Sequence, residues 1–150
     1  MADIITSDLV DLDLQATDRQ AATRTLAERL ATAGRVTDLD GFLADVRARE
    51  AQMPTGIEGG IGIPHARSAH VTEPTLGFGR SAAGIDWGAE DGPAHLIFLI
   101  AAPEGGGAEH MTILASLARR LIHENFRQAL REAPDEQTVV DLVHKEVLGR

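Results

Sequence analysis

Gly60-Ile61-Gly62-Ile63-Pro64-His65 is an apolar hexapeptide that ends in a histidine, and its pattern predicts a short β-strand. Side chains alternate along a strand, so Ile61, Ile63 and His65 share one face. The first two can be buried while His65 emerges at the end of the strand. Pro64 has no N–H and a fixed φ, which predicts that the hydrogen-bonded ladder ends there. We therefore expect a histidine held rigidly at the edge of a sheet.

A second strand and a helix follow in the other half of the chain. Residues 94–102 are almost continuously apolar, which is typical of a strand buried on both faces. The chain then passes through Pro103-Glu104-Gly105-Gly106-Gly107 to a helix whose apolar stripe consists of His110, Leu114, Leu117 and Leu121. A helix start after a glycine loop offers unpaired N–H groups and favours an anion such as phosphate.

Composition limits the classes of function. The chain has 150 residues, of which 43% are hydrophobic, and this predicts one globular domain over residues 1–150. A net charge of −9 opposes binding to nucleic acid or to an anionic membrane surface. No cysteine is present, which excludes disulfides and thiolate metal sites, and neither a Walker A nor a dinucleotide-binding glycine motif occurs. With no leader and no apolar run of about 20 residues, we expect a cytoplasmic protein that can associate with a membrane permease.

Helical and strand patterns alternate along the chain. Helices are expected over about 18–33, with Thr17-x-x-Gln20 as a capping box and Gly34 after the end, and within 36–49, capped by Asp38 and closed by Arg49. Further elements are expected as a lead-in with a short strand at 4–14, a strand near 76–80, a short edge element at 85–88, and helices over 125–132 and 135–147. Interleaved helices and strands predict an α/β sandwich.

These motifs together carry a resemblance to a known family. Arg49-Glu50, Thr55-Gly56-Ile57, the segment 60–66 and Glu109-His110-Met111 resemble the IIA component of the bacterial phosphoenolpyruvate-dependent sugar phosphotransferase system, of the fructose/mannitol type. The segments 68–74 and 101–110 are more similar to the fructose branch than to the mannitol or nitrogen-regulatory branch. The family usually has a small residue where this chain has Glu58 and alanine where it has Gly62. The resemblance implies a mixed sheet, flanked here by helices on both faces.

The resemblance also implies roles for individual residues. His65 would accept a phosphoryl group from the small carrier protein HPr and pass it to a cysteine on a IIB domain of a sugar permease. His110 would be the second active-site histidine and Arg49 the arginine that contacts the phosphate. Thr55, Gly107 and Glu109 flank these residues in the matching motifs, and we expect them to contribute to substrate binding.

The chemistry of these residue types is consistent with that function. A neutral imidazole is a good nucleophile toward phosphorus, and with an ordinary pKa near 6.5 histidine is mostly neutral at cytoplasmic pH. Phosphoryl transfer needs mainly positioning and stabilisation of charge on the phosphoryl oxygens. Arg49, His110 and the N–H groups at the start of its helix could supply both. No metal, nucleotide or other cofactor is required.

Three other functions are open at the level of sequence. The nearest is a regulatory, nitrogen-type IIA phosphoprotein that is not coupled to transport and uses the same His65 chemistry. A second is an anion-binding module that holds a ligand without reacting. A third is a metal hydrolase that uses His65, His70 and His110, although no His-Glu-x-x-His or comparable ligand set supports it.

Overall fold

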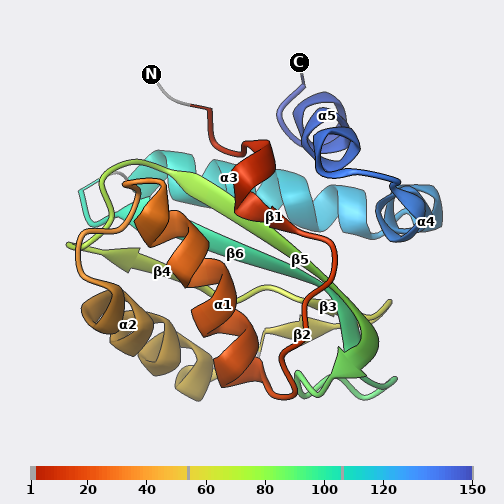
Figure 1. Ribbon diagram of the computed structural model, residues 1–150, viewed down its shortest axis with the longest axis horizontal. Coiled ribbons are helices and arrows are strands. Elements are labelled where there is room, and N and C mark those ends of the chain that lie inside the picture. Colours follow the sequence, from red (N-terminus) through yellow and green to blue (C-terminus); the bar gives the residue numbers. More distant parts are fainter. Residues whose placement is uncertain (1–2, 54, 106, 150) are drawn as a thin grey trace.

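A mixed β-sheet forms the middle layer of the molecule, which was analysed as a computed structural model (Figure 1). The structure describes residues 3–53, 55–105 and 107–149, and the side chains of residues 106–111 lie outside this description. Within the described residues the sheet has six strands: β1 (Val10–Asp11), β2 (Gly56–Ile57), β3 (Ile61–Gly62), β4 (His65–Ser68), β5 (Thr75–Ile85) and β6 (Ala94–Pro103). β5 and β6 pair antiparallel, while β3 and β4 both pair parallel with β6.

Helices cover both faces of this sheet, as predicted. In Figure 1, α1 (Arg19–Thr32) and α2 (Leu39–Gln52) lie on one side, and α3 (Gly107–Leu121), α4 (Glu124–Glu132) and α5 (Glu136–Glu146) lie on the other. A short 3-10 helix, η1 (Ser7–Leu9), precedes β1. The predicted fold class, a mixed sheet between two helical layers, is confirmed.

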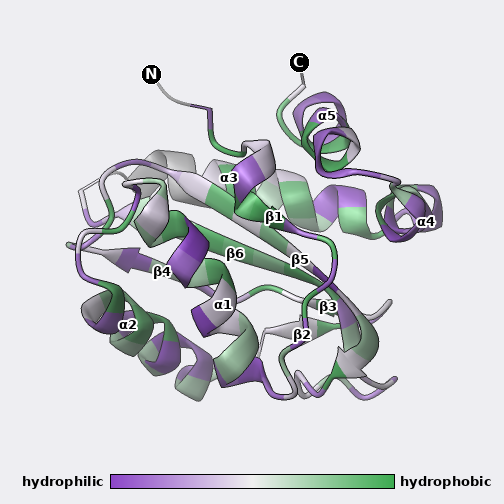
Figure 2. Cartoon of the chain, viewed as in Figure 1, coloured by the Kyte–Doolittle hydropathy of each residue, from purple (hydrophilic) through white to green (hydrophobic). Residues whose placement is uncertain are grey.

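Strand β6 supplies the centre of both hydrophobic cores. Leu96, Phe98 and Ile100 pack in the core that includes α3, α4 and α5, whereas Ile97, Leu99 and Ala101 pack in the core that includes α1 and α2. All six are fully buried, which explains the uninterrupted apolar run in the sequence. In Figure 2 the strands of the centre are coloured mainly as hydrophobic, and the helices carry mixed colouring.

Residues 61–68 run along one side of β6 in a single register. Ile61 lies opposite Leu96 and His65 lies opposite Ile100, so the same offset holds on both sides of Pro64. The Pro64 carbonyl accepts a hydrogen bond from the Ile100 N–H at 3.0 Å, but proline has no N–H to donate, and the strand is interrupted there. The prediction that the ladder ends at Pro64 was wrong, because pairing resumes and continues to Ser68. His65 begins β4 instead of ending a strand.

Helix caps confirm most of the predicted boundaries. The Asp38 side chain accepts from the Gly41 N–H and caps α2, and Gly34, with φ of +79°, follows the end of α1. The N-cap of α1 is Asp18, whose carboxylate accepts from the Ala21 N–H, so the predicted box that begins at Thr17 was wrong by one residue.

Three further boundaries differ from the prediction. The strand near 76–80 is the first half of β5, which continues to Ile85, so the separate edge element at 85–88 does not form. Trp87 is instead buried, with 1% of its surface exposed. Arg49 is not the last residue of its helix, since α2 continues to Gln52.

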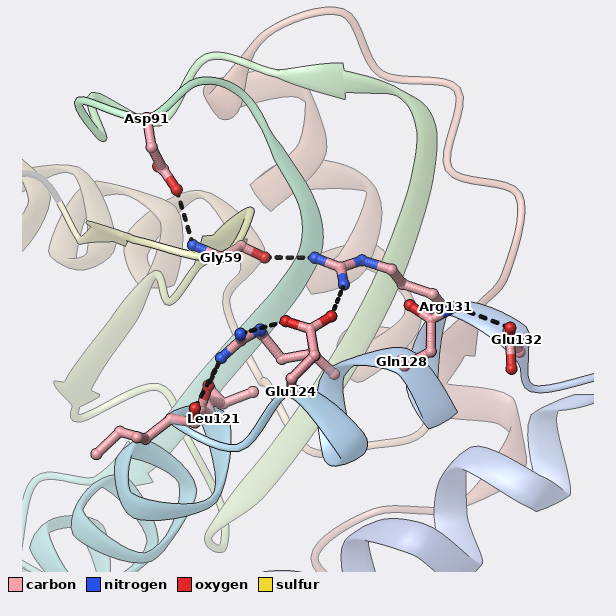
Figure 3. A network of polar contacts seen from close by, with 9 residues as sticks. Gly59, Asp91, Leu121, Glu124, Gln128, Arg131 and Glu132 are labelled. Atoms are coloured by element: carbon pink, nitrogen blue, oxygen red, sulfur yellow. Dashed lines mark hydrogen bonds and ion pairs between the residues drawn. The ribbon is translucent and has the colours of Figure 1, made fainter.

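A polar network holds the turn between β2 and β3 against α4 (Figure 3). The Gly59 carbonyl accepts from the Arg131 guanidinium at 2.6 Å, and the Gly59 N–H donates to Asp91 at 3.0 Å. Glu124 forms ion pairs with both Arg131 and Arg127. Because this turn leads directly into residues 61–68, the network fixes the start of the segment that carries His65.

Gly62 packs directly under the indole ring of Trp87. A Cβ at position 62 would lie 2.6 Å from ring carbon Cδ2 of Trp87, and the buried ring has no room to move away. This contact explains why glycine stands at position 62.

We predict that Gly62→Ala lowers the free energy of unfolding by about 1–3 kcal/mol through overpacking, although alanine in a strand is ordinarily better than glycine by about 0.5–1 kcal/mol. Gly105→Ala is the matched control, because a Cβ there would meet nothing within 4 Å. Urea denaturation measures both variants. A Gly62→Ala protein as stable as the wild type would show that the packing argument is wrong.

Candidate functional site

His65 lies at the border between the core and solvent, on the face of the sheet that α3 covers. Ile61 and Ile63, which share its face, belong to the core with α3, whereas Ala66 belongs to the core with α1 and α2. The His65 side chain is 7% exposed. The predicted alternation along this segment is therefore confirmed, but the prediction that His65 emerges from the sheet was wrong, because His65 is about as buried as Ile63.

A backbone carbonyl fixes the tautomer of the imidazole. His65 Nδ1 lies 2.8 Å from the carbonyl oxygen of Ile63. A carbonyl can only accept, so in the neutral ring Nδ1 carries the proton and Nε2 carries the lone pair. The geometry therefore directs the nucleophilic character of His65 to Nε2.

Burial keeps this imidazole neutral. Loss of solvation lowers the pKa of His65 below its ordinary value of 6.5, and the hydrogen bond to Ile63 opposes this in part. The positive charge of Arg49 lowers the pKa further, while the negative charge of Glu50 raises it. Both charges therefore act on His65, and the net effect is a neutral, nucleophilic ring at neutral pH.

Two of the predicted site residues lie near the loop between α2 and β2: Arg49 is in the last turn of α2, and Thr55 is in the loop itself. Arg49 is partly buried and donates to the Met53 carbonyl at 3.3 Å. Thr55 is buried, and its hydroxyl donates to Glu50 at 2.6 Å and accepts from the Trp87 indole N–H at 3.2 Å. The Thr55 N–H also donates to Glu50, at 2.8 Å. The hydroxyl of Thr55 thus connects the loop after α2 to Glu50 of α2 and to Trp87.

Glu50 and Trp87 were missed as supporting residues. The Glu50 carboxylate accepts both bonds from Thr55 and lies 3.6 Å from Arg19 of α1. The carbonyl of Thr55 in turn accepts from the Ile63 N–H at 3.2 Å, which joins the loop to the segment that carries His65. Glu50 adjoins Arg49 in the sequence, and Trp87 is the one tryptophan of the chain, but no periodic pattern links either to Thr55.

The remaining predicted residues lie in the first turn of α3. Its side chains at positions 107–111 lie outside the described part, so the contacts expected of Gly107, Glu109 and His110 stay predictions. The backbone of these residues is helical, as expected. The body of α3 packs on the same face of the sheet as Ile61 and Ile63. The helix that carries His110 therefore covers the face on which His65 lies.

Other polar residues singled out from the sequence lie away from His65. His70 Nδ1 is 3.9 Å from Asp38 at the start of α2, and the His70 N–H donates to Ser68. Glu58 is exposed in the turn between β2 and β3. This turn precedes Ile61, at the other end of β3 from His65. Among the described side chains, no three His, Asp or Glu residues gather in a way that could hold a metal ion.

The fold and the site define a small α/β protein with a buried histidine, His65, in an edge strand of its sheet, next to a backbone carbonyl. The chain belongs to the EIIA 2 family of the phosphoenolpyruvate-dependent sugar phosphotransferase system, whose model matches residues 3–146. It is therefore a IIA component, an intermediate in phosphoryl transfer, as predicted.

Similar proteins agree with this assignment. The chain is 40% identical over 144 residues to the fructose-specific EIIA component of the phosphotransferase system of Haloferax volcanii, with 95% of this chain and 94% of that protein covered. It is 41% identical over 117 residues to the fructose-specific EIIABC component of the phosphotransferase system of Bacillus subtilis. This match covers 77% of this chain and 18% of that longer protein.

Solved structures share the fold. The nitrogen regulatory protein IIA-Ntr of Neisseria meningitidis superposes with a TM-score of 0.86 at 26% identity, with 93% of this chain and 96% of that chain covered. IIA mannitol of Escherichia coli superposes with a TM-score of 0.78 at 24% identity, with 93% and 98% covered. In the described part of the chain, no helix has the length and apolar character needed to cross a membrane.

We predict that the imidazole of His65 titrates below pH 6.5, because burial disfavours its charged form. In Arg49→Gln the midpoint should rise, since the lost positive charge no longer opposes protonation, but it should stay below 6.5 because the ring stays buried. Histidine C–H resonances followed by NMR against pH give both values. A wild-type midpoint at or above 6.5, or no change in Arg49→Gln, would contradict this electrostatic description.

Proposed function

We propose that His65 is the residue of this IIA component that accepts a phosphoryl group from phosphorylated HPr. It then passes the group to a cysteine of a IIB domain, for uptake and phosphorylation of a sugar, which we propose is fructose. The observation that carries the proposal is the hydrogen bond between His65 Nδ1 and the Ile63 carbonyl, which leaves the lone pair on Nε2. Because this chain has no cysteine, the acceptor must lie on another domain or protein.

The transfer is a displacement at phosphorus. The lone pair of His65 Nε2 forms a bond to phosphorus as the bond from phosphorus to the donor atom of HPr breaks, and that donor atom keeps the electron pair. The proton on Nδ1 stays on the hydrogen bond to Ile63. In the second step a cysteine thiolate attacks the same phosphorus, and the lone pair returns to Nε2.

Neighbouring residues stabilise and position this reaction. The positive charge of Arg49 acts on His65, which supports a role for Arg49 in binding phosphoryl oxygens, and a charge-assisted bond of this kind contributes about 1.5–3 kcal/mol. His110 and the N–H groups near Gly107 and Glu109 would bind the group from the start of α3. Thr55 acts through the loop, since Glu50 and Trp87 occupy its hydroxyl.

Transport of fructose is favoured over a purely regulatory role by the relatives with the highest identities quoted above. Those at 40% and 41% identity carry fructose-specific names, whereas the nitrogen regulatory protein is 26% identical. The similarity to that regulatory protein supports the common fold. A regulatory role would use the same chemistry at His65.

We predict that the protein gains one phosphoryl group when it is incubated with phosphoenolpyruvate and the general phosphotransfer proteins. His65→Ala should gain none, because the nucleophile is absent, and His110→Ala should be labelled on His65 more slowly. Intact-protein mass spectrometry under alkaline conditions, where phosphohistidine is stable, measures the adduct.

His70→Ala is the matched control, since His70 lies beside Asp38 and away from the site, and it should be labelled at the wild-type rate. Full labelling of His65→Ala would remove His65 from its role. A phosphoryl group mapped to His110 would exchange the roles of the two histidines.

A further inference from the structure

One more cation lies on the face of the sheet that carries His65. Ile61, Ile63, His65 and Arg67 alternate with residues that point to the opposite face, and they follow one another from the core to the surface. The first three are 0%, 6% and 7% exposed, whereas Arg67 is exposed. Along this strand, Arg67 is thus the next side chain after His65 on the same face, and it is exposed.

The guanidinium of Arg67 is anchored and keeps most of its donors available. Its Nη2 donates to the Glu104 carbonyl at 2.9 Å, in the loop between β6 and α3. Within the described residues no carboxylate lies within 4 Å of this guanidinium, although the chain has a net charge of −9. Most other arginines that the structure describes are paired with acids: Arg19, Arg24, Arg29, Arg35, Arg120, Arg127 and Arg131.

An arginine of this kind suits an anion that arrives from solvent. Guanidinium has five N–H donors in a planar fork, of which the contact to Glu104 uses one. Two residues of a strand span about 7 Å, so an arginine side chain can reach a group bonded to the histidine two positions before it. The bond to Glu104 limits the freedom of Arg67 before any ligand arrives, and this lowers the entropic cost of binding.

We propose that Arg67 is a second phosphate-binding arginine, which contacts oxygens of the phosphoryl group from the solvent side as the group moves between the partner and His65. This inference rests on the proposed role of His65. Arg67 neither gains nor loses a proton, because guanidinium stays charged throughout. It lowers the barrier by stabilising negative charge on the phosphoryl oxygens while the bond from phosphorus to the donor atom of HPr breaks and the bond to Nε2 forms.

The experiment measures single-turnover transfer from phosphorylated HPr to the full chain over a range of HPr concentrations. Arg67→Gln should lower the maximal rate by about ten- to a hundredfold, and Arg67→Lys should restore part of it, because lysine keeps the charge but not the fork. Arg119→Gln removes the same charge from the exposed end of α3, where the arginine contacts Ser116, and should stay within twofold of the wild type. Thermal melts should show that all three variants fold.

A second readout separates contact with phosphate from a purely structural or docking role. The ³¹P resonance of phosphorylated His65, recorded without any partner, should move in Arg67→Gln and stay in place in Arg119→Gln. A maximal rate for Arg67→Gln within twofold of the wild type would overturn the inference. So would a change confined to the half-saturating HPr concentration. If the wild type itself takes no phosphoryl group on His65, the proposed function fails first, and the same series shows this directly.

Discussion

The pairing of residues 61–68 with β6 is the constraint on which the rest of the site depends. β6 is buried on both faces, so its register with its neighbours is fixed by two hydrophobic cores at once. A slip of one residue would exchange Ile61 and Ile63 with Gly62 and Pro64, and would turn His65 to the other face. The continuous register across Pro64 therefore decides which helix covers the histidine.

The same pairing determines the chemistry of His65. Ile63 lies next to Pro64, between β3 and β4, and its carbonyl accepts a hydrogen bond from the N–H of His65 Nδ1. Its N–H donates to Thr55, which Glu50 and Trp87 hold in turn. Thus one residue, Ile63, joins the histidine to the loop that follows α2.

Much of this architecture could be predicted from the sequence, because it follows from local patterns. The apolar run of β6, the cap at Asp38, the glycine after α1 and the alternation from Ile61 to His65 each depend on near neighbours along the chain. The errors arose where two local signals competed. Thr17 and Asp18 are both good N-caps, and the structure uses Asp18. Pro64 was expected to end the ladder, but its carbonyl still pairs with Ile100.

The supporting contacts could not be predicted, since they join residues that are distant in the sequence or lie in irregular segments. Thr55 meets Trp87 across 32 positions, and Arg67 meets Glu104 across 37. The glycine at position 62 is explained only once Trp87 is seen to cover it. Propensity and periodicity report which residues are buried, and they carry no information on which buried residues meet.

We propose that the Ile63 carbonyl keeps the proton on Nδ1 and so directs phosphoryl transfer to Nε2 of His65. The most direct measurement is an NMR spectrum of the phosphorylated protein with ¹⁵N-labelled histidine, in which coupling to ³¹P identifies the bonded ring nitrogen. We expect the coupling at Nε2 and an N–H resonance at Nδ1. A phosphoryl group on Nδ1 of His65 would contradict the account, because that nitrogen would have had to give up its bond to Ile63.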